Sequence, residues 1–405
     1  MRYHQSAADI CLKTDENPAL YILCRNRYND FYSGEVTGSV EGIKREKLCG
    51  FSGKEYDCSM NREIYRNASG FIVSYKSTDE PLLFNEMKSR LNAAALQKRG
   101  EASADFSVQN YEEVVAEIKR EDFIFMAHIH PYMQKRDIEG KTTDYVIYLD
   151  MLRELLPMLE KPDTMVCQCK IDSAVQMEYS NKELTALLAE ELRKHGFVVE
   201  PQKAGTVISL TVYDKQAYMG VSAMEDNVSD WTGGVLFYSK NEDIICRAEF
   251  KIEEACKTFG IGLAAGMRAL DLGAAPGGWT HFLSRQGLLV DAVDPAELSD
   301  KVLQMDNVKH YKMTAQEFVK NREKASYDIM VNDMKMDTNE SVDISCEMSS
   351  QLKEGGICLM TLKLPKTGAM KRIKIARKVL ERDFSQVKIR KLYYNRSEVT
   401  VLAVK

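Results

Sequence analysis

The 405-residue sequence predicts an α/β protein whose C-terminal part is a doubly wound, mostly parallel, Rossmann-like sheet. Two observations support this fold class. From about residue 245 onward, apolar strand-like runs alternate strictly with helical patterns, which is typical of a parallel sheet covered on both faces. The first of these strands also runs into a glycine-rich turn, Leu270-Asp-Leu-Gly-Ala-Ala-Pro-Gly-Gly-Trp279, of the kind that opens a nucleotide-binding crevice.

The C-terminal elements follow one another closely along the chain. We expect strands at 267–272, 288–293, 308–312, 327–332, 357–362, 387–393 and 398–404, and helices at 247–259, 278–285, 314–323, 341–353 and 367–382. Only residues 394–397 connect the last two strands. Such a short connection requires an antiparallel hairpin at the end of the sheet, since parallel neighbours need a long crossover.

The N-terminal half predicts two smaller domains of mixed structure. The first has expected strands at 18–25, 70–75 and 123–130 and helices at 83–98 and 110–119; the second has a helix at 144–158, a strand at 164–171, a helix at 180–195 and strands at 206–213 and 216–221. Residues 224–234 are polar and form the expected link to the sheet. We therefore expect an N-terminal α+β domain at 1–140, a second domain at 141–235 and the nucleotide-binding domain at 236–405.

Composition excludes several classes of protein. No run of about 18 apolar residues occurs, and the first residues lack an apolar segment, so neither a membrane-spanning helix nor a secretory signal is expected. The ten cysteines include no Cys-x-x-Cys pair, which argues against a zinc or disulfide framework and for a reducing compartment. We expect a cytoplasmic protein without a metal site.

The charge is unevenly distributed along the chain. Its net value is −5, but residues 351–405 hold 14 Lys and Arg against 4 Asp and Glu, so this segment carries +10 and the remaining 350 residues −15. A local basic face matters more for binding phosphates than the total charge. The alternative is an ordinary solvated helix face; the basic residues concerned are Lys371, Arg372, Lys374, Arg377 and Lys378.

The glycine-rich turn has the features of a cofactor loop. A buried strand, a turn rich in glycine and a helix follow one another, so backbone groups can approach a ligand at the helix N-terminus. Asp294, at the end of the second strand, comes 21 residues after Gly273, where a ribose-diol acceptor lies in such folds. Two alternatives remain open: glycines that only tighten a turn, and a nicotinamide site. The G-x-G-x-x-G spacing of the latter is absent, and Pro276 occupies the loop.

Four charged residues are expected near this loop. Asp333 ends the fourth strand and Lys363 ends the fifth, which places both at the carboxyl edge of the sheet, where ligands bind. Lys251 lies on the helix before the sheet, and Glu398 begins the last strand. Any one of them could belong to an ordinary salt bridge. Their combination with the loop is what indicates a catalytic site.

These motifs resemble the ribosomal RNA large-subunit methyltransferase M family and, more widely, the FtsJ-like 2′-O-methyltransferases with their Lys-Asp-Lys-Glu tetrad. The matching segments are Cys246-Arg-Ala-Glu-Phe-Lys251, Asp271-Leu-Gly-Ala-Ala-Pro-Gly-Gly-Trp-Thr280, Asn332-Asp-Met334, Leu362-Lys-Leu-Pro365 and Leu392-Tyr-Tyr-Asn-Arg-Ser-Glu-Val-Thr-Val401. The resemblance implies transfer of a methyl group from S-adenosylmethionine to the 2′-oxygen of a cytidine in large-subunit ribosomal RNA.

The resemblance also assigns roles to residues. The tetrad would be Lys251, Asp333, Lys363 and Glu398, and the cofactor site would include Gly273, Ala275, Pro276, Gly277, Gly278, Asp294 and Asp333. Relatives often carry an acid near the position of Thr314, where we expect a backbone contact to the cofactor. Residues 122–125 resemble the end of the family's ferredoxin-like domain, and residues 164–222 resemble its THUMP module, which binds RNA.

The tetrad suits the chemistry of a weakly acidic hydroxyl. A lysine can accept a proton only if its pKa falls well below about 10.4, and burial and a second ammonium group both lower it. We expect Lys363 to be the base and Lys251 to tune it, while Asp333 and Glu398 hold the ammonium groups in place. Single-stranded or bent RNA is the expected partner, because a splayed nucleotide exposes its hydroxyl.

Two other functions remain as alternatives. A base-directed methyltransferase would share the cofactor loop, but would more often show Asn-Pro-Pro-Tyr or a cysteine after the fourth strand, where this chain has Asn332-Asp-Met-Lys335. A non-catalytic RNA-binding protein could retain the fold. The presence of all four tetrad residues argues against it.

Some residues outside this set also attract attention. His128 and His130 share one side of a strand, a spacing that can bind metal, but no acidic or cysteine partner is close, so a structural pair is expected. Of Tyr393 and Tyr394, one is expected in the core and the other exposed, where it could stack on an RNA base. Trp279 is expected to pack the loop helix.

Overall fold

The computed structural model describes residues 60–91, 95–120, 122–160, 164–172, 176–202, 204–213, 215–238, 243–320 and 327–405. They form two compact units. The N-terminal unit spans residues 50–238 together with 390–393, and the C-terminal unit contains residues 239–389 and 394–405. The strand expected at 18–25 lies outside the described residues.

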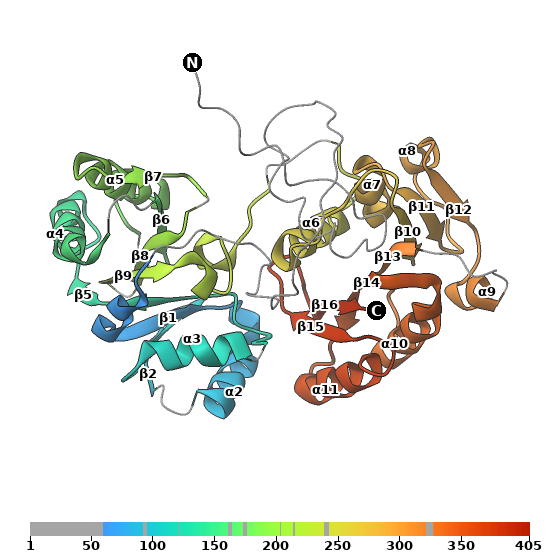
Figure 1. Cartoon of the computed structure of the whole chain (residues 1–405), viewed down its shortest axis with the longest axis horizontal. Helices are drawn as coiled ribbons and strands as arrows, with labels where there is room; N and C mark the ends of the chain where they lie inside the picture. Colours follow the sequence, from blue (N-terminus) through green and yellow to red (C-terminus); the bar gives the residue numbers. More distant parts are fainter. Residues whose placement is uncertain are drawn as a thin grey trace, which may run out of the picture. The chain divides into compact units, whose positions relative to one another are not determined.

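The first part of the N-terminal unit is a four-stranded antiparallel sheet with two helices (Figure 1). Its elements are β1 (Gly70–Ser74), α2 (Glu80–Arg90), β2 (Ala95–Arg99), β3 (Ser103–Ser107), α3 (Tyr111–Arg120) and β4 (His128–Tyr132). The strands lie in the order β2-β3-β1-β4. This βαββαβ succession is the ferredoxin-like arrangement that the resemblance implied.

The second part of this unit is a five-stranded sheet in the order β5-β9-β8-β6-β7. Its elements are β5 (Gln134–Asp137), α4 (Tyr145–Leu155), β6 (Thr164–Ile171), α5 (Asn181–Lys194), β7 (Val198–Val199), β8 (Thr206–Tyr213) and β9 (Gln216–Ala223). Strand β8 pairs with β6 in parallel and with β9 antiparallel, so the sheet is mixed.

The two sheets of the N-terminal unit share a core. Ile72 and Tyr132 of the first sheet pack with Tyr213 and Tyr218 of the second in one buried cluster. Lys170 of β6 is largely buried and reaches the first sheet, where its Nζ donates to the hydroxyls of two serines at 2.8 and 3.2 Å. Since the sheets are joined in this way, the domain boundary predicted at residue 140 remains a prediction.

Several elements of this unit differ from the sequence prediction. The helix expected at 83–98 ends at Arg90, and residues 95–99 form β2 instead, paired with β3. The strand expected at 123–130 begins only at His128. The apolar residues before it form a buried loop, whose amides at Ile124 and Phe125 donate to the carboxylate of Glu86 at 3.1 and 2.9 Å. Strands β3, β5 and β7 were not predicted.

The C-terminal unit is built on a seven-stranded sheet in the order β12-β11-β10-β13-β14-β16-β15. Its elements are α6 (Ala248–Phe259), β10 (Arg268–Leu272), α7 (Gly278–Arg285), β11 (Leu289–Val293), α8 (Asp300–Leu303), β12 (Val308–Tyr311), α9 (Ala315–Lys320), β13 (Tyr327–Asn332), α10 (Thr338–Glu347), β14 (Leu352–Lys363), α11 (Ala369–Leu380), β15 (Gln386–Arg390) and β16 (Glu398–Val404). Strands β10 to β14 pair in parallel, and β16 runs antiparallel to β14. The predicted fold class is confirmed.

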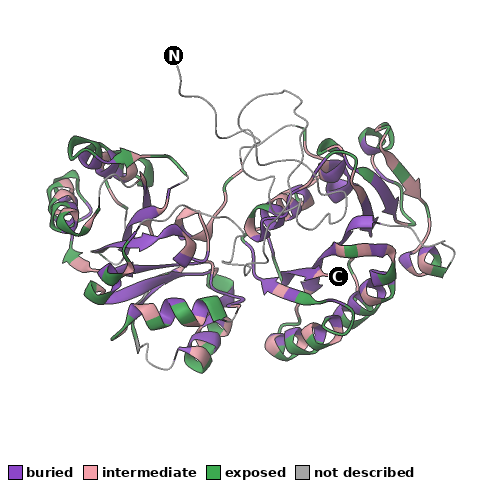
Figure 2. Ribbon diagram, in the orientation of Figure 1, coloured by how far each residue is buried: buried purple, intermediate pink, exposed green. Residues whose placement is uncertain are grey.

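Helices cover both faces of this sheet. Helices α10 and α11 pack together on one face, and α6 and α7 pack together on the other (Figure 1). Figure 2 shows the strands buried and the outer faces of the helices exposed. Some boundaries differ from prediction. The helix expected at 341–353 ends at Glu347, the strand expected at 357–362 begins earlier, at Leu352, and the strand expected at 387–393 ends at Arg390. Helix α8 was not predicted.

The order of the strands places a crevice in this sheet. The chain moves outward from β10 to β12, and then returns to the other side of β10 with β13. Ligands bind at such switch points, beyond the carboxyl ends of the strands. No helix in the described part of the chain is long and apolar enough to cross a membrane.

Candidate active site

The glycine-rich loop joins β10 to α7 at this switch point. Gly273 and Gly277 have φ angles of +77° and +110°, in the left-handed region that favours glycine, and Gly277 caps the N-terminus of α7. The peptide bond between Ala275 and Pro276 is cis. A side chain at Gly273 would overlap Met334, which follows Asp333, so the loop lies directly against the end of β13.

Two aspartates hold the loop from either side. The carboxylate of Asp294, at the end of β11, accepts hydrogen bonds from the amides of Ala275 at 3.1 Å and Ala296 at 2.8 Å. Asp271 of β10 is buried, and the hydroxyl of Thr280 on α7 donates to it at 2.6 Å. Burial raises the pKa of Asp271 to about 7, although the hydrogen bond from Thr280 opposes the rise.

The four predicted tetrad residues meet in one closed ring of ion pairs. Lys363 Nζ lies 2.8 Å from Asp333 Oδ1 and 2.8 Å from Glu398 Oε2. Lys251 Nζ lies 3.1 Å from Asp333 Oδ2 and 2.8 Å from Glu398 Oε1. Each lysine therefore bridges both carboxylates, and each carboxylate bridges both lysines. Their side chains are 8 to 27% exposed, so the ring is reachable from solvent but largely enclosed.

Local structure fixes each member of the ring. Lys363 and Glu398 are direct cross-strand partners in the antiparallel pairing of β14 with β16. Asp333 follows a turn shaped by Asn332, whose side chain is fully buried. The Asn332 side chain accepts a hydrogen bond from the amide of Met334 at 3.1 Å and donates to the hydroxyls of two serines of α10. Lys251 is brought in by the first turns of α6.

Thr361 is a part of the site that the sequence analysis missed. Its hydroxyl donates to Asp333 Oδ1 at 2.6 Å and accepts from Lys363 Nζ at 3.0 Å. Residues two apart on a strand face the same side, so its position relative to Lys363 was a usable signal. Thr361 orients the Asp333 carboxylate beneath the lysine.

The carboxylates control the protonation of the ring. Burial lowers the pKa of Lys363, but Asp333 and Glu398 outweigh it and raise that pKa above the ordinary value. For the acid Glu398 the two effects have opposite signs. Burial raises the pKa of Glu398, but hydrogen bonds from Lys251 and Lys363 outweigh it and lower that pKa to about 2. The sequence-based expectation of a lowered lysine pKa is therefore wrong for the ring as it stands, because both carboxylates contact Lys363.

Thr314 makes no hydrogen bond to the other predicted cofactor residues in the described part of the chain. It follows β12 and caps α9: its amide and hydroxyl both donate to the carboxylate of Glu317, at 2.9 and 2.8 Å. Its carbonyl accepts from the amide of Phe318 at 3.0 Å. The polar groups of Thr314 are thus used within the helix cap, and its cofactor contact stays a prediction.

A second layer of contacts ties α6 to α7 beneath the loop. Trp279 is buried, and its Nε1 donates to the carbonyl of Ala248 at 2.8 Å, as expected for a residue that packs the loop helix. The buried pair of Glu249 and His281 adds a 2.9 Å contact between the same helices. This pair was not predicted. It connects the helix that carries Lys251 to the helix that follows the glycine-rich loop.

The two histidines of β4 have protein partners. His130 contacts the hydroxyl of Thr211 at 2.9 Å through Nε2, and His128 contacts that of Ser229 at 3.1 Å through Nδ1. Burial lowers the pKa of both, that of His130 to about 4, so both rings are neutral at physiological pH. Among the described residues no group of three or more metal-ligating side chains is assembled.

The adjacent tyrosines differ in burial, although Tyr394 is only partly buried and not in the core as expected for one of the pair. Tyr394 packs on Phe250 with ring centroids 5.2 Å apart. Tyr393 is 43% exposed and lies 6.1 Å from the ring of Phe237, which is 78% exposed. Tyr393 and Phe237 both belong to the N-terminal unit.

Comparison with known proteins supports a catalytic C-terminal unit. Residues 244–400 match the FtsJ-like methyltransferase family. The chain is also similar to curated proteins named ribosomal RNA large subunit methyltransferase M. It is 26% identical over 317 residues to that of Pseudoalteromonas translucida, covering 73% of this chain and 84% of the relative. It is 28% identical over 257 residues to that of an Azoarcus species, covering 60% and 67%.

These matches confirm the resemblance to the ribosomal RNA large-subunit methyltransferase M family that the motifs indicated. Among solved structures, TrmN from Thermus thermophilus is similar over 83% of this chain and 99% of its own, with 13% identity and a TM-score of 0.36.

Proposed function

We propose that the protein uses S-adenosylmethionine to methylate a ribose 2′-hydroxyl, and that its target is a cytidine of large-subunit ribosomal RNA in the cytoplasm. The observation that carries the proposal is the closed ring of two lysines and two carboxylates beside the glycine-rich loop. A base-directed methyltransferase would need the loop but has no use for an amine held at this edge. The relatives' names support ribosomal RNA as the substrate.

The residues of the loop fit S-adenosylmethionine. The two left-handed glycines bring backbone close to the N-terminus of α7, whose first amides favour a carboxylate. Asp294 is half-exposed at the end of β11 and offers two oxygens to a ribose diol. We assign cofactor binding to Gly273, Ala275, Pro276, Gly277, Gly278, Asp294 and Asp333. When bound, the cofactor supplies an electrophilic methyl group.

Lys363 is the residue that we assign as base. In the ring it is protonated, because its pKa is raised. A positive charge on bound S-adenosylmethionine beside the ring would disfavour the ammonium form of Lys363. Covering of the crevice by RNA would have the same effect, so both favour loss of the Lys363 proton. The neutral Nζ then takes the proton from the 2′-hydroxyl. Asp333 and Glu398 keep Nζ in one position, and Lys251 keeps the two carboxylates paired when Lys363 becomes neutral.

The N-terminal unit would grip and position the RNA. We propose a ferredoxin-like domain within residues 1–140 and a THUMP-like domain at 141–235, followed by the methyltransferase domain at 236–405. Support comes from the βαββαβ order of the first sheet and from the exposed rings of Phe237 and Tyr393, which can stack on bases.

Identification of the methylated nucleoside tests the reaction. We expect purified protein, given methyl-labelled S-adenosylmethionine and unmodified large-subunit RNA transcribed in vitro, to place the label in 2′-O-methylcytidine after digestion to nucleosides. RNA that carries a 2′-O-methyl group at the labelled site is the control and should accept none. Label on a base would support a base-directed enzyme. RNA binding without any label would support a binding protein or a different RNA substrate.

Substitution of Gly273 tests the loop. Gly273→Ala places a side chain at a φ of +77° and against Met334, so we expect the affinity for S-adenosylhomocysteine to fall by about tenfold or more. Gly266→Ala is the matched control, because its φ is +85° but no atom lies within 4 Å of the added carbon. Calorimetric titration measures both. Equal affinities in the two variants would show that the loop at Gly273 does not bind the cofactor.

A further inference from the structure

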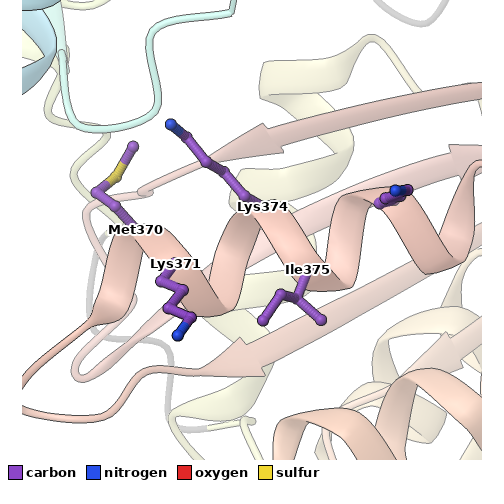
Figure 3. Close-up of a pocket in the computed structure, with 5 residues that line it drawn as sticks. Met370, Lys371, Lys374 and Ile375 are labelled. Carbon is purple, nitrogen blue, oxygen red and sulfur yellow. The ribbon is translucent and has the colours of Figure 1, made fainter.

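Helix α11 has an unusual outer face. Its buried positions, Ala369, Ile373, Ala376 and Leu380, follow the spacing of a core-facing stripe. The opposite face exposes Lys371, Lys374, Ile375 and Lys378, and with Met370 these residues line a shallow hollow (Figure 3). We call Lys371, Lys374 and Lys378 the lysine stripe. It extends over about 10 Å along the helix axis, given a rise of 1.5 Å per residue.

The lysine stripe differs from several charged positions on other helices. In α3, α5 and α6, some exposed basic residues pair with acids one turn away, as Arg120 does with Glu117, Lys194 with Glu190 and Lys257 with Glu253. Helix α11 contains no acidic residue. None of the three stripe lysines has a hydrogen bond or ion pair within the described part of the chain. Like charges one turn apart destabilise a helix, so these unpaired lysines lower the stability of α11 unless an anion binds them.

The position of the stripe relates it to the site. Strand β14 ends at Lys363 on the carboxyl edge of the sheet, and α11 begins six residues later at Ala369. The helix therefore starts at the edge that holds the ring of ion pairs and carries three positive charges away from it along one face. Ile375, 45% exposed, lies between the lysines and offers an apolar surface to a sugar.

We propose that the lysine stripe binds the phosphates of the RNA strand that carries the target nucleotide. This inference rests on the proposed function. Charge complementarity selects a polyanion, and three lysines spaced along one exposed helix suit successive phosphates of one strand, which lysines bind as point charges without reading sequence. The stripe would hold the strand while its nucleotide lies in the crevice.

The test compares two triple variants of the full-length protein. The stripe variant is Lys371→Gln/Lys374→Gln/Lys378→Gln, in which glutamine preserves helix propensity. The control variant is Lys257→Gln/Lys309→Gln/Lys312→Gln; these lysines are exposed on the same unit, and each has a protein partner in a carboxylate or a ring. Both variants lose three positive charges. The dissociation constant of deproteinised large-subunit RNA is measured between 50 and 300 mM KCl.

We expect the stripe variant to bind RNA at least about tenfold more weakly and its salt dependence, the slope of log K against log salt, to fall by about 2 to 3. The control should change less than about twofold. The affinity for S-adenosylhomocysteine, which reports an intact fold, should be equal in all three proteins. Equal losses in both variants, or none in the stripe variant, would overturn the proposal. So would stripe-dependent binding to vesicles containing phosphatidylserine with no effect on RNA.

The two proposals fail in different ways. If the stripe is wrong but the function is right, the stripe variant still forms 2′-O-methylcytidine with an unchanged KM for RNA. If the function is wrong but the stripe is right, no ribose methylation occurs and RNA binding still weakens when the stripe is removed.

Discussion

Lys363→Ala is expected to lower kcat by about a thousandfold or more, while S-adenosylhomocysteine and RNA still bind. Two losses combine in this variant. The amine that we assign as base is gone, and Asp333 and Glu398 lose one of the two cations that they share. Single-turnover rates with labelled S-adenosylmethionine measure the chemical step separately from RNA binding and product release.

Strand β14 offers a matched control for this variant. At its other end Lys353 also pairs with an aspartate, Asp328 of the neighbouring strand β13, at 2.7 Å. Lys353→Ala therefore removes the same side chain and the same kind of ion pair from the same strand, but far from the crevice. Its rate should remain within about twofold of the unchanged protein. Comparable rates in both variants would rule out Lys363 as the base.

The raised pKa of Lys363 gives the unchanged protein a characteristic pH profile. Only the small fraction of free enzyme with a neutral Nζ can react at pH 7, so kcat/KM is expected to rise by about tenfold per pH unit between pH 7 and 9. The residual activity of Lys363→Ala should lack this dependence. A flat profile in the unchanged protein would mean that Lys363 stabilises charge and does not accept the proton.

Asp271→Asn is expected to stabilise the C-terminal unit more at pH 8 than at pH 5. Burial raises the pKa of Asp271 from 3.8 to about 7, so the folded protein binds this proton more tightly than the unfolded chain. The stability contribution of the group is therefore complete below pH 3.8 and is lost as the pH rises through 7. Asparagine is neutral throughout, and its oxygen can still accept the hydrogen bond from Thr280.

The size of this effect follows from linkage. Between pH 5 and pH 8 the penalty for the buried carboxylate grows by on the order of 2 kcal/mol, so the difference in melting temperature between Asp271→Asn and the unchanged protein should widen by about 5 °C. Calorimetric scans at the two pH values measure it. A difference that stays constant with pH would show that Asp271 has the same charge in both conditions.

Most of the C-terminal sheet could be predicted because its signals are local and long. Buried parallel strands are continuous apolar runs, and each is separated from the next by a helical pattern. Asp333 and Lys363 could be placed because strand ends in such a sheet share one edge, whereas the tetrad roles of all four residues came from the resemblance to the FtsJ-like methyltransferases. The protonation state of Lys363 could not be predicted. It depends on the carboxylates of Asp333 and Glu398 reaching the same Nζ, and Glu398 does so from the neighbouring strand.

The N-terminal unit was harder because tertiary contacts override local preference there. Residues 95–99, Ala-Leu-Gln-Lys-Arg, favour helix, yet they form β2 by pairing with β3. The apolar run at 123–126 resembles a strand, but the Glu86 carboxylate satisfies its amides, so it remains a buried loop. A carboxylate from a distant helix gives no signal within the run itself.

The place of β16 in the sheet has a consequence for the synthesis of this protein. This strand comes last of the seven along the chain, but it lies between β14 and β15. Until it leaves the ribosome, β14 presents an unpaired edge and Lys363 lacks Glu398. A growing chain can build the glycine-rich loop before that moment, but it acquires the complete ring only when β16 inserts. The proposed activity therefore depends on the strand of this sheet that is synthesised last.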